Sequence, residues 1–94
     1  MKKIFSIILI LLFTGICFAE NKEYNKARIS VLTFLDKGSY VIIKEEHETN
    51  YIRKEHIKYI SVKETELVID NFSFSYEKYI IGYNSSNNLA ITRK

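Results

Sequence analysis

The chain has 94 residues, with fourteen Lys and Arg against eleven Asp and Glu, and a single cysteine. Two of the lysines stand at the amino terminus, so the rest of the chain is close to neutral and its charges are interleaved. Such a chain lacks the one-signed field that suits nucleic acid or anionic lipid, and we expect neither partner. The single cysteine excludes an internal disulfide, and the length corresponds to one domain.

Residues 1–19 have the layout of a secretory signal peptide. Two lysines precede an uncharged apolar run over residues 4–19, and the charged Glu20 follows at once. A permanent membrane span needs about 20 apolar residues, so this run is better suited to a cleaved signal. The small side chains of Cys17 and Ala19 favour cleavage after Ala19. We therefore predict an exported protein, periplasmic or secreted.

Two alternatives stay open for this leader. Lipidation of Cys17 would anchor the protein through acyl chains, although Ile16 stands where a small residue normally precedes the modified cysteine. Retention of residues 4–19 would leave the protein membrane-anchored, because the run is only a few residues short of a span. An uncleaved leader would then be the protein's membrane contact.

A short polar segment precedes the predicted β domain. Residues 20–27 are charged and hold one large apolar side chain, so we expect a flexible or loosely helical lead-in. From Arg28 onward the sequence pattern becomes typical of β-strands, so we predict one small β domain over residues 28–94. This domain would hold no thiol, since the only cysteine lies in the leader.

The first predicted element of the domain is a β-hairpin. Residues 28–35 carry apolar side chains on both faces of an extended segment, which is typical of a strand covered on both sides. Residues 36–39 form a turn in which Gly38 would take a positive φ. Residues 40–43 then return as the second strand.

The middle of the chain also favours strands. Residues 51–53 are extended, residues 54–56 form a tight connector, and residues 57–62 are the next strand, because β-branched and aromatic side chains are frequent here. A helix over residues 51–60 is the alternative, because several apolar residues fit helical spacing. The same run resembles the strand–turn–strand joint of Sm-like small barrels, without a glycine signature. The resemblance implies at most a barrel fold, and we assign no family from it.

Residues 72–77 alternate apolar and polar side chains without a break, the pattern of a half-buried strand. We expect their aromatic side chains to face a core or a partner. Residues 67–69 form the preceding strand, and Asp70 and Asn71 form a two-residue turn between the two strands.

The last predicted strands are residues 79–83 and 89–92, which flank the Asn- and Ser-rich loop of residues 84–88. With them the chain holds about six to eight short strands, which predicts an all-β fold: a small antiparallel sandwich or barrel.

Residues that could carry catalysis are present without the spacing that catalysis needs. His47 and His56 are flanked by glutamates, but their separation matches no compact metal motif. No serine has a nucleophile-elbow context, and no glycine-rich phosphate loop occurs. We therefore predict no catalytic residue, no metal and no cofactor. A small metal-dependent hydrolytic enzyme that uses His47 and His56 is the alternative.

The tyrosines are the most suggestive group. Most tyrosines of a small β domain lie at the edge of the core with the hydroxyl in contact with water. This structural role is the alternative to a functional one. Tyrosine together with arginine is also what protein interfaces enrich. The candidate binding residues are Tyr51, Arg53, Tyr59, Tyr76, Tyr79 and Tyr83. The predicted function is an accessory or binding protein of the cell envelope that acts through protein–protein contacts, with an envelope protein or a second copy as partner.

Overall fold

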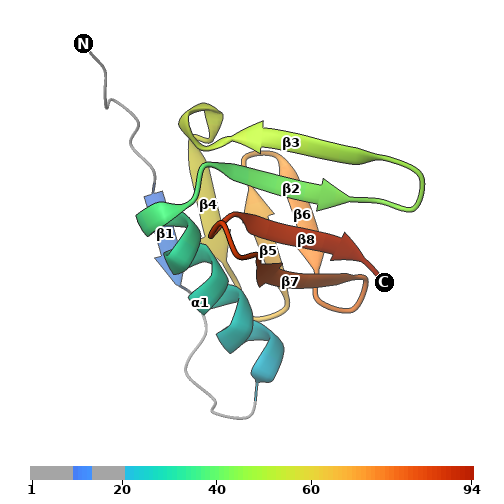
Figure 1. Cartoon of the computed structure of the whole chain (residues 1–94). Helices are drawn as coiled ribbons and strands as arrows, with labels where there is room; N and C mark the ends of the chain where they lie inside the picture. The colour runs from blue at the N-terminus through green and yellow to red at the C-terminus, as the bar shows by residue number, and fades with distance from the viewer. Residues whose placement is uncertain (1–9, 14–20) are drawn as a thin grey trace.

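The computed structural model describes residues 10–13 and 21–94, which form one α-helix, a short 3₁₀ helix and eight strands (Figure 1). Along residues 22–93 the helix comes first and seven strands follow. The helices are α1 (Lys22–Lys37) and η1 (Lys54–His56), and the strands are β1 (Ile10–Phe13), β2 (Tyr40–Lys44), β3 (Thr49–Arg53), β4 (Tyr59–Val62), β5 (Glu66–Ile69), β6 (Phe72–Ser75), β7 (Tyr79–Tyr83) and β8 (Leu89–Arg93).

Helix α1 occupies the segment for which the sequence predicted a lead-in and a first strand. The prediction of a strand over residues 28–35 was wrong, because the apolar side chains there recur at helical spacing. Ile29 and Leu32, which a strand would bury, are 50% and 44% exposed. The buried face of the helix consists of Tyr24, Ala27, Ser30, Val31 and Phe34.

Local contacts fix both ends of α1. At the start, the side-chain oxygen of Asn21 accepts the N–H of Tyr24 at 3.0 Å, and its amide nitrogen donates to the Glu64 carbonyl at 3.1 Å. At the end, Gly38 donates its N–H to the Phe34 carbonyl at 2.7 Å. The φ of Gly38 is −81°, so the predicted positive φ was wrong and no hairpin turn occurs there. A Cβ at Gly38 would instead overlap the carbonyl oxygen of Asn87.

The strands of the described residues form two four-stranded sheets. The first has the order β3-β2-β8-β7 and is mixed, because β2 and β8 run parallel while β2–β3 and β7–β8 are antiparallel. In the second, β4, β5 and β6 form an antiparallel meander, and β1 lies parallel to β4. The prediction of an all-β antiparallel sandwich or barrel is thus correct only in part: the described chain is mostly β, but it also contains α1, its two sheets are open, and β2 runs parallel to β8. Strand β2 pairs with β3 and β8, and not with residues 28–35.

Several later predictions are confirmed. The connector of residues 54–56 is η1, which joins β3 to β4, so the alternative of one helix over residues 51–60 was wrong. Asp70 and Asn71 form the predicted two-residue turn, with Ile69 and Phe72 paired across it. The Asn-rich loop lies between β7 and β8.

The core lies between the two sheets and α1. Strands of the two sheets cross steeply in Figure 1, and α1 runs along the side formed by β7 and β4. On the opposite side, β3 and β6 are the last strands of their sheets. The buried apolar residues of the strands are Val41, Ile43, Ile60, Val62, Leu67, Ile69, Phe74, Ile81, Leu89 and Ile91. The helix therefore closes one side of the core, and no α-helix among the described residues covers the other side.

Most of the predicted signal peptide, including its cleavage site, lies outside the described residues. Ile10–Phe13 of its apolar run form β1. None of the helices within residues 10–13 and 21–94 is long and apolar enough to cross a bilayer.

Candidate binding groove

An open groove of about 720 Å³ lies between the β2–β3 hairpin and strand β6. Apolar side chains from three strands line it: Ile43 from β2, Tyr51 and Ile52 from β3, and Phe72 and Phe74 from β6. The turn of residues 45–48 and Asn50 supply the polar part of the lining. We call this feature the β3–β6 groove.

In Figure 1 the β2–β3 hairpin extends past β6, and residues of this hairpin and of β6 line the groove. Ile43 and Phe74 lie at its inner end and are buried in the core. Farther out, Phe72 is 59% exposed and Tyr51 is 65% exposed. These are the two most exposed aromatic side chains among the described residues, and both line the same groove.

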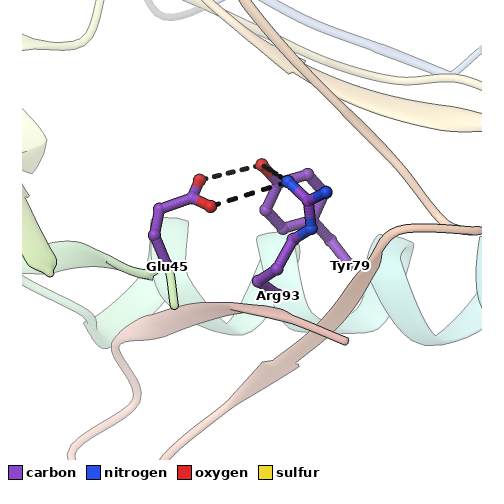
Figure 2. A network of polar contacts seen from close by, with 3 residues as sticks. All are labelled: Glu45, Tyr79 and Arg93. Atoms are coloured by element: carbon purple, nitrogen blue, oxygen red, sulfur yellow. Dashed lines mark hydrogen bonds and ion pairs between the residues drawn. The ribbon is translucent and has the colours of Figure 1, made fainter. Parts of the chain in front are cut away.

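A polar network stands at one end of the groove (Figure 2). The Tyr79 hydroxyl donates to Glu45 Oε2 at 2.8 Å, and Arg93 Nη1 lies 3.8 Å from Glu45 Oε1. The Arg93 guanidinium also sits 5.4 Å from the centroid of the Tyr79 ring, and that ring meets Phe74 edge-on at 5.2 Å. The network therefore connects the ends of β2, β7 and β8 and holds the Glu45 carboxylate in place.

The strand register accounts for this meeting of three residues. Tyr79 and Arg93 are directly opposed in the β7–β8 pair. Lys44 is opposed to Thr92 in the parallel β2–β8 pair, so Glu45 lies one position further along, beside Arg93. The ion pair is partly exposed and contributes at most about 1 kcal/mol.

The outer rim of the groove is acidic. Glu46 and Glu48 are exposed in the β2–β3 turn, which is closed by a hydrogen bond from the Glu45 N–H to the Glu48 carbonyl at 2.8 Å. Within residues 21–94 neither of these two carboxylates forms a hydrogen bond or ion pair. Arg93 balances the charge of Glu45, so the negative charge of Glu46 and Glu48 is left to solvent or to a ligand.

The predicted binding residues are not gathered into one patch. Tyr51 pairs with Ile42, Ile42 pairs with Ala90, and Ala90 pairs with Gly82. Directly paired residues project from the same face of a sheet, so Tyr51 shares a face with Gly82. Tyr83 follows Gly82 and projects from the opposite face. Of the six predicted residues, only Tyr51 lines the β3–β6 groove.

The other predicted residues have mostly local roles. Tyr76 is buried, and its hydroxyl donates toward the carbonyls of Lys63 and Glu66 at 2.7 and 3.1 Å. The pKa of the Tyr76 phenol is raised well above its usual range. Burial is the largest cause, and the nearby Tyr24 and Glu66 add to it.

Arg53 is exposed and lies 3.4 Å from Glu55, its neighbour across one residue. Tyr59 is half-buried in β4, where its N–H donates to Asp70 Oδ1 at 3.0 Å. Tyr79 belongs to the network with Glu45 and Arg93. The Tyr79 side chain thus links β7 to the ends of β2 and β8, whereas the Arg53 ion pair is solvent-exposed and the Tyr59 hydrogen bond comes from its backbone.

Sequence reasoning missed the acidic turn and Ile52 as parts of a site. The charged run of residues 44–50 resembles any solvated connection, and nothing in it indicates an apolar neighbour. Phe72 did give a signal, because its alternation with Ser73 and Phe74 predicted a side chain directed to a core or a partner. Its position beside the turn at Asp70 explains why it lies at the open end.

The two histidines share no site. His47 lies in the β2–β3 turn and His56 lies in η1, so the whole of β3 separates them. Five strand residues at about 3.3 Å each span about 16 Å, which is too far for ligands of one ion. In the described part of the chain, no group of three or more His, Cys, Asp or Glu is placed to hold a metal ion.

Comparisons with known proteins found no relative. No family model matches the chain, and neither curated proteins nor solved structures gave a match. The features of this chain that bear on its function are the predicted leader and the β3–β6 groove.

Proposed function

We propose that the processed chain is an exported binding protein of the cell envelope that acts through protein–protein contacts. The observation that carries this proposal is the β3–β6 groove, which is lined by the exposed aromatic residues Tyr51 and Phe72 together with buried apolar side chains. Contiguous apolar surface of this kind is unfavourable in water and is typical of interaction sites. The signal-like sequence of residues 1–19 favours export, and so a location in the cell envelope.

The composition of the groove suits binding better than catalysis. Its polar members are carboxylates, one imidazole and one amide, and no nucleophile activated by a base occurs among them. The alternative, a metal-dependent hydrolase, would need His47 and His56 at one ion, and β3 separates them. The lining instead combines an apolar floor with a charged rim, as protein interfaces do.

Affinity isolation of the exported protein after mild cross-linking in intact cells tests this proposal. We expect the wild-type chain to retain a partner that the Phe72→Ser variant loses. Ile80→Ser is the matched control, because Ile80 is also exposed, at 48%, and does not line the groove. Equal capture by both variants and the wild type would contradict the proposal. The mass of the native protein checks the export step, with Glu20 expected as the first residue.

A further inference from the structure

We infer that the β3–β6 groove binds an extended segment of a partner protein, in which apolar residues alternate with Lys or Arg, and that this segment adds as a strand to β6. The inference rests on the proposed function and specifies the chemistry of the partner. Three features carry it: the free edge of β6, the apolar floor and the acidic rim.

The free edge of β6 has hydrogen-bonding groups to offer. Within the described residues β6 pairs with β5 only, and Phe72 and Ile69 close a two-residue turn, so they form a hydrogen-bonded pair. Pairs of this kind alternate along the strand, and the N–H of Tyr76 accordingly donates to the Thr65 carbonyl at 3.1 Å. The backbone of Ser73 and the N–H of Ser75 therefore point away from β5, toward an added strand.

The floor of the groove sets one side-chain requirement. Phe72 and Phe74 project from one face of β6, and Ile52 and Ile43 approach from the hairpin above. In an added strand every second side chain would point toward these residues, because strand side chains alternate between faces. Apolar side chains at alternate positions would remove Phe72 from water.

The rim sets the other requirement. Glu46 and Glu48 carry unbalanced negative charge beside the apolar floor, whereas Arg93 already balances Glu45. Basic residues between the apolar ones would be complementary to these two carboxylates. An acidic segment would be repelled by the same turn.

Two segments of this chain would fit the β3–β6 groove less well than a basic segment of another protein. Strand β6 of a second copy has the sequence Phe-Ser-Phe-Ser, so it would bring no basic residue to the glutamates. Strand β1, with the sequence Ile-Leu-Leu-Phe, is also uncharged, and it lies on β4 at the other edge of the second sheet. The charge of the rim therefore favours a segment of a different protein.

The test uses the chain purified after export, in the form to which the cell processes it. The probe is a synthetic capped peptide of alternating Lys and Val. A second peptide has Pro in place of one central Val, which removes a backbone donor and interrupts the strand. A third has Glu in place of every Lys. Binding is followed by the shifts of backbone amide resonances in an isotope-labelled sample.

We expect the Lys–Val peptide to shift the amides of Ser73 and Ser75, and both other peptides to bind at least about tenfold more weakly. The Glu46→Gln/Glu48→Gln double variant should bind the Lys–Val peptide more weakly, and added salt should weaken its binding less than that of the wild type. Glu64→Gln is the matched control, since Glu64 is exposed and lies outside the groove. Phe72→Ser should also weaken binding at least about tenfold.

Each opposite result overturns the inference. Equal binding of the Pro peptide would exclude strand addition, and equal binding of the Glu peptide would exclude charge recognition. Shifts confined to β4 would place the peptide at the other edge. A dimer in sedimentation that Phe72→Ser dissociates would make a second copy the occupant. Absence of peptide binding, with partner capture that still requires Phe72, would overturn this inference and leave the proposed function standing.

Discussion

At the scale of single residues, side-chain oxygens take the place of backbone partners where strands begin. Asp70 has a φ of 53°, and its Oδ1 accepts the N–H groups of Lys58 and Tyr59 at 3.0 Å each. Asn88 Oδ1 likewise accepts the N–H groups of Ser39 and Tyr40 at 2.9 and 3.0 Å. A turn in one part of the chain thus fixes the start of a strand in another.

Replacement of Asp70 tests this role. Asp70→Ala removes the acceptor of two backbone donors and puts alanine at a positive φ, so we expect a loss of about 1–3 kcal/mol in the free energy of unfolding. Asp70→Asn keeps a side-chain oxygen and tolerates the left-handed backbone, so its loss should be clearly smaller. Urea unfolding measures both. Equal losses for the two variants would show that Oδ1 is not the stabilising group.

Tyr76 gives a prediction of pH dependence. The folded protein raises the pKa of its phenol above the ordinary 10.0. As the pH rises past that value, the unfolded phenol loses its proton while the folded one keeps it, so the free energy of unfolding falls. Tyr76→Phe cannot titrate and should lose about 1 kcal/mol at neutral pH through its missing hydrogen bonds. Its deficit relative to the wild type should shrink at high pH.

Urea unfolding of the two proteins at about pH 8 and about pH 11 checks this, because these values lie on either side of the tyrosine pKa. The other tyrosines titrate in both proteins and cancel in the difference. A deficit that stays the same at both pH values would mean that burial does not hold the proton on Tyr76.

The sequence predicted the turn at Asp70 and Asn71 because turn chemistry is local: both residue types tolerate left-handed geometry. It could not predict that Asp70 reaches the start of β4, because that contact spans residues 58–70 and depends on how the strands pair. For the same reason the sequence could not show that Tyr51 and Tyr83 project from opposite faces of their sheet. Residue type indicates an interface only after the faces of the strands are known.

At the scale of elements, α1 is the main departure from the sequence prediction. Ile29, Val31 and Thr33 are β-branched, and this local preference favoured a strand. Burial of one helical face against both sheets outweighs it, since Val31 and Phe34 are completely covered. The cap at Asn21 was a usable signal, but it lay in the segment assigned to the lead-in.

The end of α1 supplies a matched pair of glycine substitutions. A Cβ at Gly38 would lie 2.7 Å from Phe34 Cδ1 and would overlap the Asn87 carbonyl, so Gly38→Ala should lose about 1–3 kcal/mol of stability. At Gly82 the nearest atom would be Lys26 Cε at 3.6 Å, an ordinary contact, and Gly82→Ala should lose nothing. Thermal unfolding compares the two. An unchanged unfolding temperature for Gly38→Ala would show that α1 and the β7–β8 loop are less closely packed than the distances at Gly38 indicate.

At the scale of the whole molecule, the groove is lined by β3 and β6, which are the last strands of the two sheets among the described residues. β3 and β6 are separated in the chain by two strands, and periodicity in either one does not reveal that they share a groove. Strand patterns predicted the β-rich character of the fold, but neither α1 nor the parallel β2–β8 pair. The site could not be predicted, because it depends on sheet order, and the sequence supplied only the apolar alternation of β6 and the charge of the β2–β3 turn.

The leader affects the other edge of the second sheet. β1 belongs to the predicted signal peptide and lies parallel to β4, so cleavage after Ala19 would remove the neighbour of β4. The N–H of Tyr59 faces the β5 side, so by alternation the N–H groups of Ile60 and Val62 face β1.

We expect the amide hydrogens of Ile60 and Val62 to exchange faster in the processed chain than in an uncleaved Ala19→Leu variant. Ser61 is the internal control, because its N–H faces β5 in both forms. Hydrogen exchange followed by NMR measures all three. Identical exchange in the two forms would mean that the leader does not protect β4.

The most direct test of the central claim is hydrogen exchange at β6 in the isolated complex of the exported chain with its captured partner. A binding protein that takes an extended segment at this edge should show slower exchange of the Ser73 and Ser75 amides in the complex than in the free chain. The Phe74 amide, which faces β5, should change little. Unchanged exchange at Ser73 and Ser75 in a stable complex would contradict strand addition at β6.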